Sequence, residues 1–212
     1  MHEELVLKIK NFSEIYSLFE KQWLEYLNKN KIQKINFKRV RVKELDLRRP
    51  SGVVLLNYIS DYRKYVARVN PSSVSFLLEL EDIKRSRVKE ALSINQKISK
   101  YIQREANSIN AGYYVLHCLN DIFGARIIIE EIQDFDMLAN ELRKLFPNLR
   151  IINASKDIGY KAIHVYTKPL CGSLPWELQI WQRCDEANNT ELHTFYKRGY
   201  IEQIKVMQEV ID

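Results

Sequence analysis

The chain has 212 residues, 46% of them hydrophobic, which is enough to bury one sizeable core. It contains no apolar run as long as a bilayer span. Charges interrupt the apolar pattern of its first ten residues, so we expect no signal peptide. Its three cysteines lack the spacing of a zinc site or a disulfide framework. A cytoplasmic protein is the simplest expectation, and a net charge of +6 with a pI near 9.1 suits a polyphosphate or nucleic-acid partner without requiring one.

The first expected element is a helix that begins after Ser13, whose hydroxyl is typical of an N-cap. Apolar residues then recur at helical spacing, namely Ile15, Leu18, Phe19, Trp23, Tyr26 and Leu27. Further on, Val53 to Ile59 and Val66 to Leu80 are apolar and β-branched enough for either a strand or a helix, and the sequence leaves that choice open.

The segment from Lys29 to Arg49 is strongly basic. Its cations are Lys29, Lys31, Lys34, Lys38, Arg39, Arg41, Lys43, Arg48 and Arg49. An ordinary solvated face would have this composition. The alternative is a surface that follows the phosphates of RNA, because such charge releases condensed counterions on binding.

A second basic pattern lies between Arg85 and Lys97. Its polar members are Arg87, Lys89, Ser93 and Lys97. If a helix begins near Ser93, then Ser93 and Lys97 share one helix face a turn apart, and Arg87 and Lys89 share one face of the extended piece before it. Three cations and a hydroxyl at one place suit a triphosphate, although any basic helix start could supply them.

The next informative stretch follows a helix expected from Ile98 to Leu119 and broken near Gly112. An apolar run, Ala125 to Ile129, is typical of a buried strand, and Asp121 precedes it. A carboxylate at the rim of such a strand can hold Mg²⁺ together with phosphates and water. The ordinary interpretation is that Asp121 caps a turn.

The following elements complete an expected sheet. Asp134 is expected to cap a helix that carries Phe135, Leu138, Leu142 and Leu145, and Leu149 to Ile152 is expected to return as a strand. Strand, helix and strand followed by a hairpin indicate a mixed β-sheet with flanking helices, an α/β (α+β) fold.

The hairpin is expected between Tyr160 and Trp181. Tyr160, Ala162, His164 and Tyr166 lie on one face and alternate with Lys161, Ile163, Val165 and Thr167 on the other. A loop with two prolines and a glycine follows, and Trp176 to Trp181 alternates again, with Glu177 and Gln179 on one face. If the two runs pair, one sheet face carries an aromatic ring, a histidine, a carboxylate and an amide. A half-buried sheet without a site could also place polar residues there.

In this order, the polar residues resemble four motifs of RelA/SpoT-type synthetase domains. They are R-x-K-x-x-x-S-x-x-x-K at Arg87, Lys89, Ser93 and Lys97, D-x-x-G-x-R at Asp121, Gly124 and Arg126, K-x-x-G-Y-x-x-x-H at Lys156, Gly159, Tyr160 and His164, and E-x-Q at Glu177 and Gln179. The resemblance implies a nucleotidyltransferase-like mixed sheet and a small, synthetase-only member. It also implies transfer of pyrophosphate from ATP to a ribose 3′-hydroxyl, with Mg²⁺ as cofactor. Residues 81–212 would form the synthetase domain, and residues 1–80 a helical and basic segment that packs on it within one compact unit.

On the donor side, the resemblance implies that Arg87 and Arg126 sandwich adenine, that Lys89, Ser93 and Lys97 hold the ATP phosphates, and that Asp121 holds Mg²⁺. On the acceptor side, Tyr160 would stack on a base, while Lys156, beside Gly159, would meet acceptor phosphate. Glu177 would hold Mg²⁺ or take the proton of the attacking hydroxyl, with Gln179 and His164 orienting nearby groups. Positioning and charge neutralisation then carry the transfer.

The chain departs from the family on the acceptor side. Ile158 stands where Asn usually precedes the Gly-Tyr pair, Ala162 replaces a serine, and Trp181 and Gln182 replace an Arg-Thr pair. The residues of the family's closing helix are matched only loosely, by Glu191, His193, Tyr196 and Lys197.

Three hypotheses stay open. The acceptor is GDP or GTP, giving ppGpp-type alarmones, or it is the 3′ CCA end of tRNA, as in growth-arresting toxin members of the superfamily that block translation. A catalytically inactive RNA-binding or structural domain is the third, and the joint presence of Asp121, Glu177 and the basic quartet argues against it. The resemblance leaves open an antitoxin protein as partner and a homo-oligomer, and it implies no membrane association.

Overall fold

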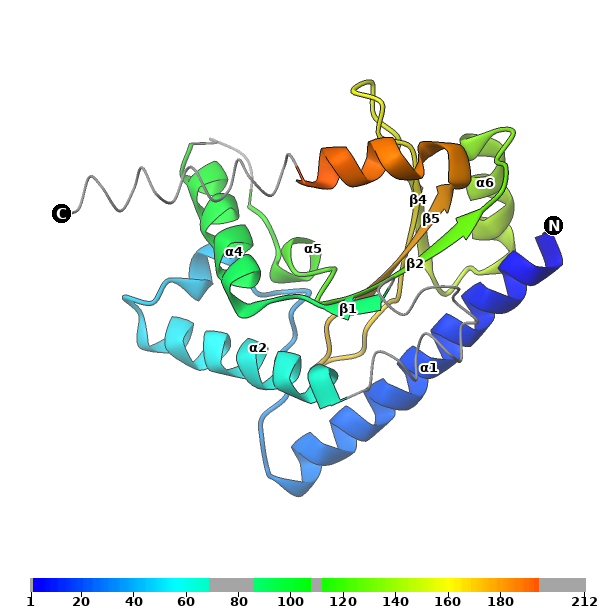
Figure 1. Ribbon diagram of the computed structural model, residues 1–212. Coiled ribbons are helices and arrows are strands. Elements are labelled where there is room, and N and C mark those ends of the chain that lie inside the picture. Colours follow the sequence, from blue (N-terminus) through cyan, green and yellow to red (C-terminus); the bar gives the residue numbers. More distant parts are fainter. Residues whose placement is uncertain (1, 69–85, 108–111, 195–212) are drawn as a thin grey trace.

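A computed structural model describes residues 2–68, 86–107 and 112–194 (Figure 1). Its elements are α1 (His2–Lys29), η1 (Val42–Leu45), α2 (Pro50–Arg68), β1 (Ser86–Val88), α4 (Ala91–Ala106), α5 (Val115–Cys118), β2 (Phe123–Ile129), α6 (Phe135–Leu145), β3 (Arg150–Asn153), β4 (Ile163–Tyr166), β5 (Trp176–Gln182) and η3 (Arg183–Asp185). Residues 186–194 continue from η3 as a helix.

The strands form one five-stranded sheet in the order β1-β2-β5-β4-β3. β2 and β5 run parallel, and the other three pairs are antiparallel. The predictions of a mixed sheet with helical cover and of a hairpin that pairs its two strands are therefore confirmed. The cap of α6 is confirmed as well, because Asp134 accepts hydrogen bonds from the backbone N–H groups of Asp136 and Met137.

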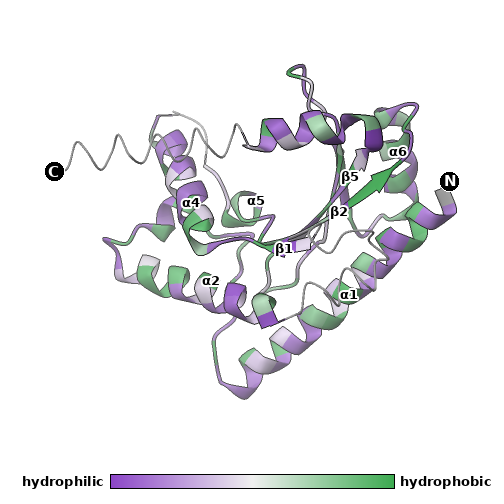
Figure 2. Cartoon of the chain, viewed as in Figure 1, coloured by the Kyte–Doolittle hydropathy of each residue, from purple (hydrophilic) through white to green (hydrophobic). Residues whose placement is uncertain are grey.

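One face of the sheet packs on α1 and α2 (Figure 1). Trp176, Leu178 and Ile180 of β5 are fully buried there. The Trp176 ring lies 4.8 Å from that of Phe19 on α1 and 4.2 Å from that of Phe123 on β2. Figure 2 shows β2 as almost wholly hydrophobic while the helices carry both colours, as expected for a strand buried under amphipathic helices. The opposite face of the sheet is thereby left to carry polar residues.

The N-cap prediction at Ser13 is wrong. α1 begins at His2, and Ser13 lies inside it, where its backbone carbonyl accepts a hydrogen bond from the Ser17 hydroxyl. The physical reason is the apolar stripe, which extends upstream through three further buried residues, Leu5, Ile9 and Phe12. Leu18 lies in α1 and Leu145 in α6, as predicted, and both are exposed.

The choice left open between strand and helix is settled for Val53 to Ile59, which belong to α2. The stretch from Val66 to Leu80 is helical up to Arg68, and the rest of it lies outside the described residues. The expected domain boundary at 80/81 and the residues Tyr196 and Lys197 also lie outside them. The helix expected from Ile98 to Leu119 is interrupted, because α4 ends at Ala106 and α5 begins at Val115. Among the described residues, no helix is both long and apolar enough to span a bilayer.

Candidate active site

The polar face of the sheet brings most of the predicted site residues together in two rows. Residues directly opposite one another on paired strands point to the same face. The first row across the sheet is Arg150, Tyr166, Glu177, Gly124 and Arg87. The second row is Ile152, His164, Gln179 and Arg126. Motifs that lie far apart in the sequence thus meet around Glu177, which stands in the middle of the first row.

Glu177 is held by a network of short hydrogen bonds. Its Oε1 accepts from the Tyr166 hydroxyl at 2.8 Å and lies 3.1 Å from His164 Nδ1, while Gln179 Nε2 donates to its Oε2 at 2.8 Å. The other imidazole nitrogen, His164 Nε2, is 2.8 Å from the Tyr160 hydroxyl. The alternation of polar residues in the two strands therefore produces a connected polar cluster with the carboxylate at its centre.

The network keeps Glu177 ionised although the residue is buried. Burial raises the pKa of the Glu177 carboxyl, but the hydrogen bond and charge of His164 outweigh it, so that this pKa lies below its ordinary value. The pKa of the Tyr166 hydroxyl is raised by its own burial and by the Glu177 carboxylate, so Tyr166 stays protonated and donates. Glu177 is thus an anion fixed in position, as a metal ligand or a hydrogen-bond acceptor must be.

A second carboxylate lies at the start of β2 between two lysines. Asp121 Oδ2 is 2.5 Å from Lys89 Nζ, and its Oδ1 is 2.9 Å from Lys97 Nζ. Lys97 also donates to the side chain of Asn120 at 3.1 Å. Ser93 lies in the first turn of α4, one turn before Lys97, as the spacing predicted. The structure therefore brings together the three predicted donor-side residues Lys89, Lys97 and Asp121.

The two lysines determine the charge of this cluster. Burial raises the pKa of the Asp121 carboxyl, but Lys97 and Lys89 outweigh it and hold that pKa well below its ordinary range. Burial likewise opposes the charge of Lys97, and the Asp121 carboxylate outweighs it and raises the pKa of the Lys97 ammonium. Asp121 and Lys97 are therefore both charged at neutral pH, and a lysine held by a carboxylate can exchange it for another anionic partner.

Asp121 and Glu177 are the candidate metal ligands. The charge of Asp121 raises the pKa of Glu177, so the two carboxylates lie within electrostatic range of each other. Within residues 2–68, 86–107 and 112–194, no group of three or more His, Cys, Asp or Glu side chains could hold a metal ion by itself. Two carboxylates fit Mg²⁺, which commonly takes one or two protein oxygens and completes its shell with water and substrate phosphates.

Arg87 and Arg126, the two residues predicted to hold adenine, lie at the ends of the two rows that are farthest from β3. Arg87 is exposed and stands opposite Gly124, which places Arg126 diagonally from it, with roughly 7–8 Å between the two backbones. The Arg126 guanidinium lies 3.3 Å from the centre of the Trp181 ring, and its Nη2 is 3.4 Å from Gln179 Oε1. Trp181 therefore covers one face of the Arg126 guanidinium.

The residues predicted to bind the acceptor differ in their exposure to solvent. Tyr160 is buried, and its ring makes edge contacts with Trp181 and with His193 of the helix over 186–194. Stacking on its face therefore requires that helix to shift. Lys156 is exposed and lines a hollow of about 280 Å³, and Gly159 has a φ of +92°, which favours glycine at the turn between Lys156 and Tyr160.

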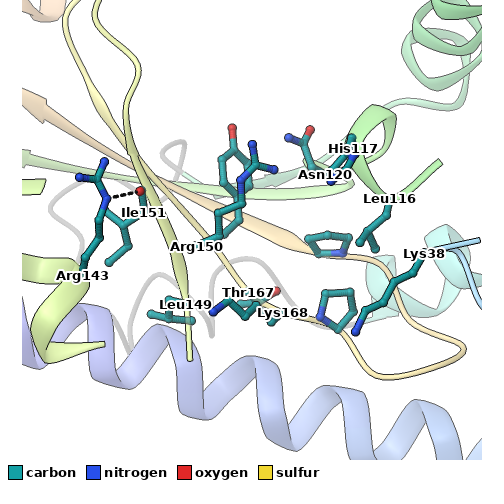
Figure 3. Close-up of a pocket in the computed structure, with 13 residues that line it drawn as sticks. Lys38, Leu116, His117, Asn120, Arg143, Leu149, Arg150, Ile151, Thr167 and Lys168 are labelled. Atoms are coloured by element: carbon teal, nitrogen blue, oxygen red, sulfur yellow. Dashed lines mark hydrogen bonds between the residues drawn. The ribbon is translucent and has the colours of Figure 1, made fainter. Parts of the chain in front are cut away.

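A larger pocket, of about 440 Å³, was not predicted (Figure 3). It lies beside Tyr166, at the end of the β3–β4 pair, and is lined by Lys38, Leu116, His117, Asn120, Arg143, Leu149, Arg150, Ile151, Tyr166, Thr167, Lys168, Pro169 and Pro175. Figure 3 shows Arg150 with Asn120 and His117 nearby, and the Arg150 guanidinium lies 5.4 Å from the centre of the Tyr166 ring. The only sequence signal was the basic segment that contains Lys38, because the other cations are scattered along the chain.

Comparisons with known proteins find a match among solved structures. No family model matches the chain, and no curated protein matches it. The chain is similar to a small alarmone synthetase. The crystal structure of the small alarmone synthetase 1 from Bacillus subtilis matches with 19% sequence identity and a TM-score of 0.36, over 74% of this chain and 85% of that chain.

Proposed function

We propose that the protein is an ATP-dependent pyrophosphokinase that transfers the β,γ-diphosphate of ATP to the 3′-hydroxyl of a ribose. The observation that carries this proposal is the sheet face itself, where two guanidinium groups, two ammonium groups and two carboxylates surround one place. Cations at one end suit a triphosphate, and fixed carboxylates suit the metal that accompanies it. The four motifs shared with RelA/SpoT-type synthetase domains point to the same chemistry.

On the donor side, adenine would lie between Arg87 and Arg126. A flat ring between two planar groups needs about 7–8 Å, or twice the usual contact distance, and the diagonal position of the two residues provides it. Lys89 and Lys97 would move from Asp121 to the phosphates, which present more negative charge. Ser93, a turn before Lys97, would donate its hydroxyl to a phosphate oxygen.

Asp121 and Glu177 would hold Mg²⁺, which neutralises phosphate charge when bound. In the transfer, the acceptor 3′-oxygen forms a bond to the β-phosphorus of ATP, the bond from that phosphorus to the α,β-bridging oxygen breaks, and AMP leaves with that oxygen. The hydroxyl proton passes to Glu177, which is ionised and hydrogen-bonded in position by Tyr166 and Gln179. His164, which joins Glu177 to Tyr160, keeps the carboxylate oriented.

The first candidate acceptor is GDP or GTP, which gives ppGpp-type products. The second is the 3′ end of tRNA, and one observation favours it. Lys38, from the basic segment Lys29 to Arg49, lines the large pocket together with Arg150 and Lys168. Part of the basic segment is thus close to the sheet face, where it could meet the phosphates of an RNA chain.

The test is a labelling experiment with ATP that carries ³²P at the β position. GDP, GTP and bulk tRNA are supplied separately, with Mg²⁺, and the products are resolved by chromatography and gel electrophoresis. We expect the label on one class of acceptor, with equimolar AMP formed. Release of AMP without a labelled acceptor indicates hydrolysis, and no consumption of ATP with any acceptor contradicts the proposed function.

A further inference from the structure

We infer that the 440 Å³ pocket beside Tyr166 binds the acceptor, as an organic phosphate that carries an aromatic base, on the side of Glu177 away from the ATP site. This inference rests on the proposed function, which requires an acceptor at that carboxylate. It assigns the acceptor to Arg150 and Lys168 in place of the stack on Tyr160 that the motifs suggest. The ligand is either a free nucleotide or the 3′-terminal nucleotide of an RNA.

The pocket combines an apolar lining with positive charge. Its apolar lining residues are Leu116, Leu149, Ile151, Pro169 and Pro175, and its charged ones are Lys38, Arg143, Arg150 and Lys168, with no Asp or Glu. An apolar lining with a few polar groups is typical of small-molecule sites, and the volume falls within their usual range of about 300–1,000 Å³. A lining with four cations and no acid selects an anionic ligand.

Three of these cations are held by neutral groups. Lys168 Nζ donates to the backbone carbonyl of Pro147 at 2.7 Å, and Arg143 Nε donates to that of Ile151 at 2.8 Å. The Arg150 guanidinium lies over the Tyr166 ring, 5.4 Å from its centre. Among the described residues, none of the four lining cations forms an ion pair. The partners of Lys168, Arg143 and Arg150 are neutral, so these three side chains are oriented while their charge stays available for phosphate.

Hydrogen bonds connect the pocket to both carboxylates of the candidate site. Tyr166 lines the pocket and donates to Glu177 Oε1 at 2.8 Å. Asn120 also lines it and accepts from Lys97, one of the two lysines that hold Asp121. Arg150 and Arg87 stand at opposite ends of the same row, with Glu177 between them. A ribose whose phosphate lies in the pocket can therefore present its hydroxyl to Glu177 from the side opposite to ATP.

The test compares two double variants that remove the same charge. Arg150→Gln with Lys168→Gln changes the pocket, and Lys144→Gln with Lys21→Gln removes two exposed cations outside it. Because charge-assisted contacts to phosphate are strong, we expect the pocket variant to raise the KM for the acceptor at least tenfold. Its kcat and its Kd for ATP should stay within twofold of those of the unmodified protein, and the control variant should change none of the three.

Binding is also measured without ATP, by equilibrium dialysis with labelled GDP and by filter binding with tRNA. Loss in the pocket variant of GDP binding alone identifies a free nucleotide as the ligand, and loss of tRNA binding alone identifies an RNA end. Unchanged binding of both, relative to the control variant, overturns the inference. This readout needs no transfer, so it separates failure of the inference from failure of the proposed function. The single Lys168→Gln variant serves if the double variant does not fold.

Discussion

Replacing Asp121 with asparagine tests the centre of the candidate site, because the change preserves shape and removes one charge. Lys89 and Lys97 then lose their anionic partner while their side chains are only 15% and 23% exposed. Each contact corresponds to about 6 kcal/mol of attraction at an effective dielectric of 20, most of it offset by desolvation. Breaking a buried pair from one side typically costs about 3–5 kcal/mol. Because both ammonium groups can regain some water, we expect a loss of about 3 kcal/mol.

For a protein of this size, that loss lowers the Tm by about 6–12 °C, which calorimetry measures directly. The freed lysines should also bind phosphate more readily, so the affinity for ATP without Mg²⁺ should rise several-fold in isothermal titration, while transfer with Mg²⁺ is lost. Glu131→Gln, at an exposed carboxylate outside the sheet face, is the matched control and should change neither quantity. An unchanged Tm together with unchanged ATP binding would show that the two lysines do not depend on Asp121, and would refute this reasoning.

Three further changes have expected outcomes. Glu177→Gln should abolish transfer, since the site needs the charge of this carboxylate, while circular dichroism should show an unchanged fold. Near-normal turnover would show that Glu177 takes no part in the reaction. Arg87→Ala or Arg126→Ala should weaken ATP binding roughly tenfold to a hundredfold, measured by titration, because stacking on a base contributes about 1–3 kcal/mol. If both variants bind ATP with the Kd of the unmodified protein, the sandwich is contradicted. Burial and the nearby Arg126 and Arg87 lower the pKa of His193 to about 4. The free energy of unfolding should therefore fall as the pH drops from about 6.5 to 4, by no more than about 3 kcal/mol. In a denaturation series over this pH range, His193→Gln should reduce the fall. If the variant and the unmodified protein give the same pH profile, the burial of a neutral imidazole is contradicted.

Alternation predicted the polar face of the sheet well. The prolines and glycine between Tyr166 and Trp176 indicated a hairpin, and the period of two on either side placed His164 and Glu177 on one face, as the pairing confirms. The start of α1 could also have been predicted, since Leu5 and Ile9 continue its apolar stripe. Ser13 was misinterpreted because a hydroxyl suits an N-cap and can equally lie inside a helix.

The pocket beside Tyr166 could not be predicted, because its position depends on the register between strands. Arg150 meets Tyr166 only because β3 pairs with β4 in one particular alignment, and a shift by one residue would turn Arg150 to the face that packs on α1. No local pattern sets that register. It follows from the burial of Ile151 and Val165 opposite each other on the apolar face. The same apolar packing that forms the core therefore also places a cation at one end of the row that contains Glu177, the end where we propose that the acceptor binds. The acceptor preference of this chain should accordingly depend on β3 and the Lys168 loop, as well as on the motif around Tyr160.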